Sequence, residues 1–459
     1  MASERAKRFT GEAERVAFDM NHRNIIRNNM TKYHTAVQKG IMQFAEPALA
    51  TEKVSSLKKK VIGNLDKYLL EFTEKFEANG GTVFWASDAA GAVAKILDLA
   101  RKYNAKTVVK SKSMTTEEIC INEAMEEKQI DVVETDLGEF IVQIAGEKPY
   151  HIVTPAMHKS KEDIARLFNR KFGTSEDFTP EQMTMFVRKL LREKFRNAEV
   201  GITGANFLVA DIGAVALTEN EGNALMSVSF PKIHIVLAGI EKVIPSLRDM
   251  ELVWSVLASK GTGQKITVYN SLLSGPAKKG EDDGPEEMIV ILLDNGRSGI
   301  LSNPEVRDSL ACIRCGACLN NCPVYKNIGG YTYDTIYSGP IGSVITPHLR
   351  GMEEFGHLSF ASSLCGKCSE VCPAGIDIPA MLLANRRMFI ECGYSGSKEK
   401  RIASNWKKAM KNRRLLNLAN GNLKNACIKF IGAKAWGPRR ELPVFSGKSF
   451  NRQWRLYRP

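Results

Sequence analysis

Cys312-Ile-Arg-Cys315-Gly-Ala-Cys318-Leu-Asn-Asn-Cys322-Pro323 is the most informative stretch of this 459-residue sequence. Its cysteines follow the spacing C-x2-C-x2-C-x3-C-P, which binds a cubane iron–sulfur cluster. A compact loop of this kind lets three thiolates reach three irons of one cube, while the fourth thiolate points away toward a second cluster. The motif therefore predicts two iron–sulfur clusters in one module.

A second motif, Cys365-Gly-Lys-Cys368-Ser-Glu-Val-Cys372-Pro373, repeats the last three cysteines of the first, with Ser362 where its first cysteine would be. Crossed ligation predicts that the fourth cysteine of each motif serves the cluster of the other motif. The first cluster, a [4Fe–4S] cube, is then expected to take Cys312, Cys315, Cys318 and Cys372. The second cluster is expected to take Cys322, Cys365 and Cys368, which leaves one iron position without a thiolate.

The missing thiolate leaves the type of the second cluster open. It is either a [3Fe–4S] centre or a [4Fe–4S] centre whose fourth iron takes Ser362, a water or a remote cysteine such as Cys392. Zinc is the alternative metal, but structural zinc sites use four ligands in two pairs, and seven cysteines in a four-plus-three pattern fit that poorly. We expect the other two cysteines, Cys120 and Cys427, to be inert.

Upstream of the cysteines, predicted helices and strands alternate from residue 56 to about 300, which is typical of an α/β domain with a mostly parallel sheet. The sequence Thr179-Pro-Glu-Gln182 combines an N-cap, an N1 proline and an N3 glutamine, and predicts a helix that ends near Arg196. Helices are also expected at 58–79 and 90–103 and from a capping box at 115–118. The expected strands are 82–87, 106–110, 131–135, 208–217, 233–237, 266–269 and 288–293.

Changes in composition divide the chain into four parts. They are a helical extension over residues 1–55, the α/β domain over 56–302, a helical ferredoxin-type iron–sulfur domain over 303–395, and a basic tail over 396–459. The whole chain carries a formal charge of +13. Residues 393–459 alone hold 17 basic and 2 acidic side chains, so the rest of the chain is close to neutral.

The basic tail interleaves its cations with Trp406, Phe430, Trp436, Trp454 and Tyr457. This pattern suits an anionic membrane surface or an acidic redox partner, and it also resembles a nucleic-acid footprint or a solvated tail. The longest apolar stretches fall far short of the roughly 18 residues that span a bilayer. With no apolar segment after Met1, we expect a cytoplasmic protein, peripheral to the inner face of the membrane where the tail contacts it.

Weaker signals lie in the α/β domain. Glu219 would sit at the carboxyl end of the strand 208–217, where α/β sheets bind ligands, and Glu219-Asn-Glu-Gly222 resembles the glutamate motif of CoA-transferases. Gly201-Ile-Thr-Gly-Ala-Asn206 could present backbone N–H groups to an anion. Lys110 and Lys112 could meet a carboxylate or phosphate, but we expect them to be solvated. Nothing in the sequence has the form of a dinucleotide or ATP fingerprint.

Several of these segments together resemble the iron–sulfur lactate utilisation protein B family. The resemblance rests on the two cysteine motifs, Gly329-Gly-Tyr-Thr-Tyr, Gly339-Pro-Ile-Gly342, Lys110-Ser-Lys-Ser-Met114, Asp136-Leu-Gly-Glu-Phe140 and Thr218-Glu-Asn-Glu-Gly-Asn223. It implies a lactate utilisation domain of the sugar-phosphate isomerase and CoA-transferase-like fold, followed by a two-cluster helical ferredoxin domain like those of succinate dehydrogenase and glycolate oxidase subunits.

The resemblance also implies a role in oxidising L-lactate to pyruvate with two partners. These would be a cysteine-rich protein of the heterodisulfide-reductase type and a second lactate utilisation domain protein. We expect this chain to be a non-catalytic electron-transfer component. The alternatives are an iron–sulfur enzyme with substrate at the open iron of the second cluster or at Glu219, the iron–sulfur subunit of another 2-hydroxy-acid oxidase of the glycolate type, and a nucleic-acid-binding regulator.

Overall fold

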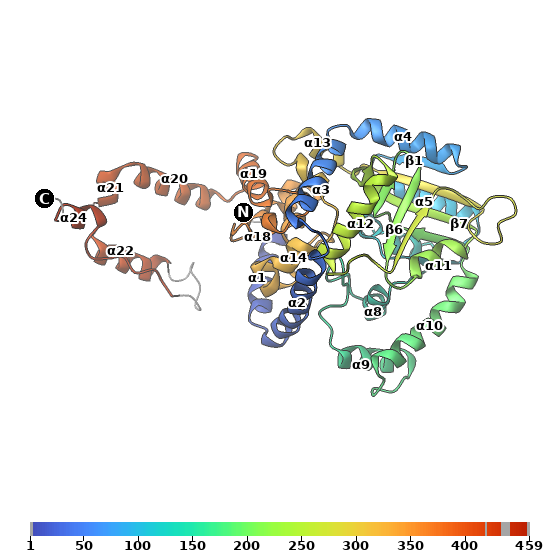
Figure 1. The fold of residues 1–459 in the computed structure, drawn as a ribbon. Helices are drawn as coiled ribbons and strands as arrows, with labels where there is room; N and C mark the ends of the chain where they lie inside the picture. Colours follow the sequence, from blue (N-terminus) through green and yellow to red (C-terminus); the bar gives the residue numbers. More distant parts are fainter. Residues whose placement is uncertain (1–2, 418–419, 433–440, 457–459) are drawn as a thin grey trace. The chain divides into compact units, whose positions relative to one another are not determined.

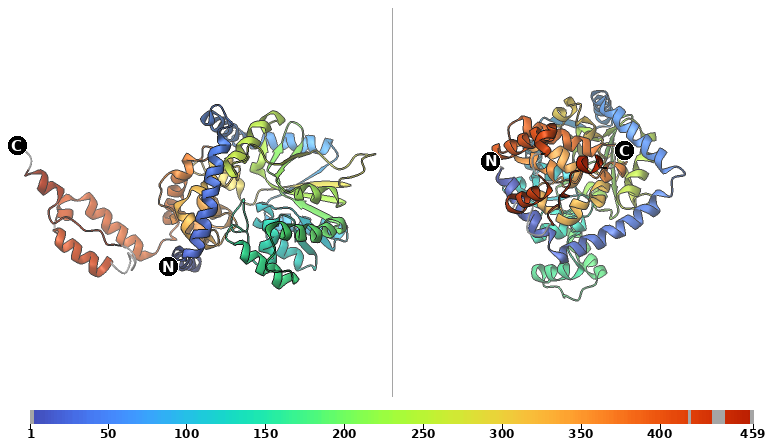
Figure 2. Two further views of the ribbon diagram at one scale, coloured as in Figure 1. Left: turned by 60° about the horizontal axis from the view of Figure 1, so that its bottom comes forward. Right: turned by 90° about the vertical axis from the view of Figure 1, so that its left-hand side faces the viewer.

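The computed structural model describes residues 3–417, 420–432 and 441–456. They form two units: Ser3–Glu391, and the segment from Cys392 onward. Figures 1 and 2 show the α/β part and the cysteine-bearing helices within the first unit. Trp436 and Tyr457, two aromatic residues of the basic tail, lie outside the described residues.

A six-stranded sheet forms the centre of the α/β part, in the order β1-β10-β7-β4-β2-β3, and every neighbouring pair is parallel. Its strands are β1 (Thr82–Ala86), β2 (Thr107–Lys110), β3 (Asp131–Glu134), β4 (Val200–Thr203), β7 (Ile233–Gly239) and β10 (Glu287–Leu293). The neighbouring inner strands β7 and β10 are largely apolar and buried on both faces, as parallel strands covered by helices are.

Helices cover both faces of this sheet. Phe72 and Phe76 of α4 (Leu65–Ala78) pack on one face with Val290 of β10. On the other face, Ile96 of α5 (Ala89–Lys102) packs with Ile289 of the same strand. Alternate residues of one strand therefore enter two separate cores, which explains why its sequence reads as one continuous apolar run.

A second, four-stranded sheet corrects one prediction. The expected strand 208–217 is a hairpin, because β5 (Phe207–Val209) turns at Gly213 and returns antiparallel as β6 (Ala214–Glu219). Gly213 has φ +56°, and a Cβ there would lie 2.3 Å from the backbone nitrogen of Phe76, so only glycine fits this turn. The sheet is completed by β8 (Val243–Ile244) and β9 (Tyr269–Leu273), the latter later in the chain than the predicted 266–269.

The helix predictions hold in part. The capping box of Thr179 and Gln182 is present and opens α10 (Pro180–Asn197). The expected helix 58–79 is two helices, α3 (Pro47–Ile62) and α4, separated at Gly63-Asn64. The predicted box at 115–118 is wrong, because Ser113 is the N-cap of α6 (Met114–Glu118) and accepts a hydrogen bond from the Thr116 N–H. The other α/β helices are α7 (Ile121–Glu126), α8 (Leu137–Ala145), α9 (Lys161–Phe172), α11 (Asn223–Ser229), α12 (Leu247–Gly261) and α13 (Arg297–Ser302).

The cysteine-bearing part is built from short helices, and the N-terminal helices complete its core. Ile26 and Met30 of α2 (Met20–Ile41) are buried among Leu319 and Tyr325 of this part. Arg5 and Arg8 of α1 (Glu4–Ala17) both pair with Asp334. The helices of this part are α14 (Ala317–Asn321), α15 (Pro323–Ile328), α16 (Gly339–Arg350), α17 (Met352–Phe355), α18 (Lys367–Glu370) and α19 (Ile378–Glu391).

The C-terminal unit is helical and presents apolar side chains to solvent. Its helix α20 (Ser397–Lys411) exposes Ile402, Trp406 and Met410 at successive fourth positions, by 69%, 62% and 44%. The unit also contains α21 (Arg413–Asn417), α22 (Gly421–Cys427) and α24 (Phe450–Trp454). All helices that the structure describes are too short or too polar to span a lipid bilayer.

Candidate iron–sulfur module and adjoining cavity

Cys312, Cys315, Cys318 and Cys372 line one small cavity with apolar walls. The first three come from the loop before and the start of α14, and Cys372 follows α18. The loop is tightly shaped, because Arg314 and Gly316 both have positive φ, at +60° and +78°. A Cβ on Gly316 would touch the Val153 side chain at 3.0 Å, which brings the loop close to the α/β part.

The remaining motif cysteines, Cys322, Cys365 and Cys368, line a second cavity together with Ser362. The hydroxyl oxygen of Ser362 accepts a hydrogen bond from the Leu364 N–H at 3.1 Å. Cys365 is exposed, whereas Cys322 and Cys368 are buried. The structure thus separates the seven cysteines into groups of four and three, and it places the first and second motifs side by side in both cavities.

The thiols of the two cavities differ in electrostatics. Burial raises the pKa of Cys315 to about 12 and that of Cys368 to about 11. The pKa of Cys365 is lowered, chiefly because the Lys367 N–H donates a hydrogen bond to its sulfur. Thiols must lose their protons to become metal ligands, so buried thiols of high pKa release protons when a metal binds and compensates their charge. An all-sulfur donor set around apolar cavities suits iron–sulfur clusters.

A buried ion-pair network joins the first cavity to the sheet. Arg297 donates to Glu241 at 2.6 Å and makes a two-point contact with Glu118. Arg314 of the cysteine loop donates to the other oxygen of Glu241 at 3.3 Å, and its guanidinium lies 4.8 Å from the centre of the Tyr337 ring. The two arginines hold the pKa of Glu241 at about 2 despite its burial. Two cations and two anions therefore balance inside the protein.

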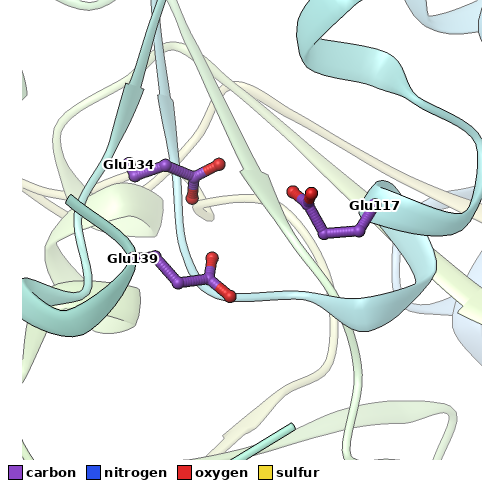
Figure 3. Close-up of side chains that lie close together, drawn as sticks. All are labelled: Glu117, Glu134 and Glu139. Atoms are coloured by element: carbon purple, nitrogen blue, oxygen red, sulfur yellow. The ribbon is translucent and has the colours of Figure 1, made fainter. Parts of the chain in front are cut away.

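Lys110 was expected to be solvated, and this expectation is wrong. Its side chain is fully buried, and its ammonium contacts Glu134 at 2.7 Å and Glu117 at 3.0 Å. Glu139 of α8 completes a cluster in which oxygens of the three carboxylates lie within 4.8 Å of one another (Figure 3). Burial and the neighbouring Glu134 raise the pKa of Glu139 well above its usual range. The raised pKa favours the protonated form of Glu139, and the Lys110 ammonium compensates the negative charge of the other two carboxylates.

Glu219 caps a helix, a role that the sequence did not indicate. Its carboxylate accepts hydrogen bonds from the N–H groups of Ala224 and Leu225, at 2.7 and 2.9 Å, and so caps the start of α11. Nearby, the Asn206 side chain accepts a hydrogen bond from the Thr218 N–H, which fixes the end of the segment 201–206 against β6. Both carboxylate oxygens of Glu219 are therefore engaged by backbone, unlike those of a free nucleophile.

A larger cavity of about 390 Å³ lies where the carboxyl ends of the sheet strands face the cysteine loop. Its walls include Lys112, Lys242, Glu221 and Asn206 of the α/β part and Arg314 and Cys315 of the cysteine loop. These residues come from segments far apart in the chain, from Lys112 to Cys315, and no local sequence pattern marks them. Lys112 donates a hydrogen bond to the Val153 carbonyl, so this second expected surface lysine is also partly buried.

Comparisons with known proteins match both parts of the chain. The LUD domain family model matches residues 69–293, and the 4Fe-4S dicluster domain model matches residues 308–376. The Uncharacterized electron transport protein YkgF of Escherichia coli is 41% identical, over 88% of this chain and 86% of the relative. Lactate utilization protein B of Lysinibacillus sphaericus is 40% identical, over 88% and 87%. The protein of the same name from Bacillus cytotoxicus is 46% identical, over 73% and 70%.

Among solved structures, a duf162 family protein from Deinococcus radiodurans aligns with 50% of this chain and 98% of its own, at 16% identity and a TM-score of 0.28. The domain matches confirm the two-part order predicted from the sequence. The cysteine-bearing part is an iron–sulfur dicluster domain.

The buried carboxyl of Glu139 predicts a pH dependence of stability. A carboxyl whose pKa is raised by folding favours the folded state below its unfolded pKa, and this contribution is lost as the pH rises. Glutamine resembles the protonated acid, so Glu139→Gln should flatten the loss of stability between pH 5 and pH 8. Each unit of pKa shift is worth about 1.4 kcal/mol. Urea unfolding at both pH values measures the effect.

The matched control is Glu126→Gln, which changes an exposed carboxyl on α7. This variant should keep the wild-type difference in unfolding free energy between the two pH values. An unchanged pH dependence in Glu139→Gln would show that Glu139 is ionised in the folded protein.

Proposed function

The chain belongs to the lactate utilization protein B family, and from that premise we propose that it is the electron-transfer subunit of a complex that oxidises L-lactate to pyruvate. Its relatives carry the words lactate utilization and electron transport in their names. The observation that carries the proposal is the division of seven cysteines between a buried cavity and one that reaches the surface. One end of the module faces the α/β part, and the other end faces solvent.

We assign the cluster ligands by cavity. Cys312, Cys315, Cys318 and Cys372 would hold a [4Fe–4S] cluster, and Cys322, Cys365 and Cys368 would hold the second cluster. Ser362 lines the second cavity and offers an oxygen ligand for a fourth iron. Cys392, the remote thiol considered from the sequence, is exposed and begins the separate C-terminal unit. A [3Fe–4S] centre is the alternative for the second cavity.

The clusters supply one-electron chemistry when bound. The surrounding protein determines from which side a partner could exchange electrons with the clusters. The N-terminal helices α1 and α2 exclude water from one side of the module, and the core there is continuous from Met30 to Leu319. Exposed Cys365 and Lys367 mark the place where a partner would approach. Following the family, the partners would be a cysteine-rich protein of the heterodisulfide-reductase type and a second lactate utilisation domain protein.

The alternative hypothesis, that Glu219 is a catalytic nucleophile, has less support than the electron-transfer role. Both oxygens of Glu219 accept hydrogen bonds from the backbone of α11, so the carboxylate already serves as a helix cap. We therefore place no covalent step on this residue. The reading with substrate at an open iron of the second cluster depends on the cluster type, which iron analysis decides.

Crossed ligation makes a prediction that sequence order alone would not suggest. Cys372→Ser should remove the first cluster, as Cys315→Ser does, although Cys372 lies in the second motif. Cys322→Ser should likewise match Cys368→Ser. Each variant should lose about half of the iron and one of the two sets of EPR signals, because a cube missing one thiolate is bound less tightly. Iron and sulfide analysis with EPR, on protein purified without oxygen, measures both.

The control is Cys427→Ser, which replaces an exposed cysteine of the C-terminal unit and should keep all the iron. If Cys372→Ser instead loses the same signals as Cys365→Ser, ligation is not crossed. The wild-type iron content also decides the second cluster, since about eight irons indicate two cubes and about seven indicate one [3Fe–4S] centre.

We further propose that the C-terminal unit binds the inner face of the cytoplasmic membrane. Ile402, Trp406 and Met410 form an exposed apolar stripe on α20, and the segment 393–459 carries 17 cations. An amphipathic helix with apolar and basic faces lies in the interface of anionic bilayers. Each Lys or Arg near such a surface contributes about 1 kcal/mol. A nucleic acid is the competing polyanion.

Co-sedimentation with lipid vesicles tests whether the C-terminal unit binds a membrane. Full-length protein should pellet with vesicles that contain anionic lipid and stay in solution with neutral ones, and salt should weaken the binding. Trp406→Ala should lower the affinity by at least about tenfold, because burying a large side chain is worth about 1.5–3 kcal/mol. Trp85→Ala, an exposed tryptophan of β1, is the control and should bind as the wild type does. Equal pelleting with neutral vesicles, or none with anionic ones, would contradict the proposal.

A further inference from the structure

The cavity between the sheet and the cysteine loop has the size and chemistry of a binding site. Its volume of about 390 Å³ falls within the range of small-molecule sites, roughly 300–1,000 Å³. It lies outside the carboxyl ends of parallel strands, where α/β proteins place ligands. Gly204 and Gly261 keep its walls close together, since a Cβ on Gly204 would lie 2.6 Å from the Ser113 hydroxyl and one on Gly261 would lie 3.1 Å from the Cys315 carbonyl.

Three cations line this cavity. Lys112 and Lys242 come from the α/β part, and Arg314 comes from the cysteine loop, where its Nη2 group contacts Glu241. Like charges gathered around one cavity repel one another. An anionic ligand between them would offset that repulsion.

The lining also carries acceptors. Glu221 accepts a hydrogen bond from the Leu137 N–H with one carboxylate oxygen, and among the described residues no hydrogen bond reaches the other oxygen. Asp136 lines the same cavity. A carboxylate without a second partner accepts a hydrogen bond from a hydroxyl group. A ligand that satisfies the cations and Glu221 therefore combines an anionic end with a hydroxyl donor.

We propose that this cavity binds a small hydroxycarboxylic acid, with its carboxylate toward Arg314 and Lys242 and its hydroxyl group toward Glu221. The acid would lie directly against Cys315, a cysteine assigned to the first cluster. The choice of acid rests on the proposed function, but the binding itself rests on the cavity. The α/β domain is then a substrate-binding domain whose site shares a wall with the cluster module.

Calorimetric titration of the cluster-loaded, full-length protein tests the proposal with L-lactate and acetate as probes. The wild type should bind L-lactate saturably and at least tenfold more tightly than acetate, which lacks the hydroxyl group. Lys242→Gln should weaken the binding of both acids by roughly tenfold. Glu221→Gln should mainly reduce the preference for L-lactate. The control, Lys232→Gln, breaks an exposed ion pair with Glu286 and should change neither affinity.

The EPR signal of the first cluster gives a second readout. Lactate bound beside Cys315 should shift this signal, and the shift should be lost in Lys242→Gln protein that keeps its full iron content. A wild-type protein with intact clusters that binds neither acid, or variants that bind as the wild type does, would overturn the proposal. Failure of binding with crossed ligation intact leaves the electron-transfer role standing. Loss of electron transfer with binding intact would refute that role alone.

Discussion

The carboxylate of Glu241 holds the two parts of the first unit together. It lies between Arg297, which follows β10, and Arg314, which belongs to the cysteine loop. A buried charge that loses its partner is strongly destabilising, by about 3–5 kcal/mol. Each member of the network therefore depends on the others, and Glu118, the last residue of α6, closes it. The cysteine loop consequently cannot shift without breaking ion pairs at the edge of the sheet.

The same network sets the electrostatics of the first cysteine cavity. Arg314 places a fixed positive charge beside the loop, and its backbone N–H lies 3.4 Å from the Cys312 sulfur. Positive charge and hydrogen bonds to sulfur stabilise the reduced, more negative form of a cluster, whereas burial opposes it. The second cavity also has hydrogen bonds to sulfur, from the Lys367 N–H to Cys365 and from the Tyr325 N–H to Cys322, but it reaches solvent at Cys365. Two similar ligand sets thus occupy different environments, which is a means of giving them different potentials.

The features predicted well from the sequence are those fixed by local chemistry. The cysteine spacing, the capping box at Thr179 and the apolar strand β10 each depend on residues close together in the chain. The hairpin at 208–217 was missed because its turn contains a single glycine within an apolar run, and the need for glycine there arises from contact with Phe76. Lys110 was misplaced because three glutamates that neutralise or neighbour it come from three different elements. Charge burial of that kind is a tertiary property.

The adjoining cavity likewise depends on residues that only the tertiary fold brings together. Lys112 follows β2, Lys242 follows β7, and Arg314 belongs to the cysteine loop, so three cations from separate segments line one cavity. A scaffold that only positioned the cysteines would gain nothing from gathering like charges, because they repel one another. An anion that arrives and leaves would offset this repulsion. The gathered cations therefore favour a ligand-binding role for the α/β domain, beyond support of the clusters.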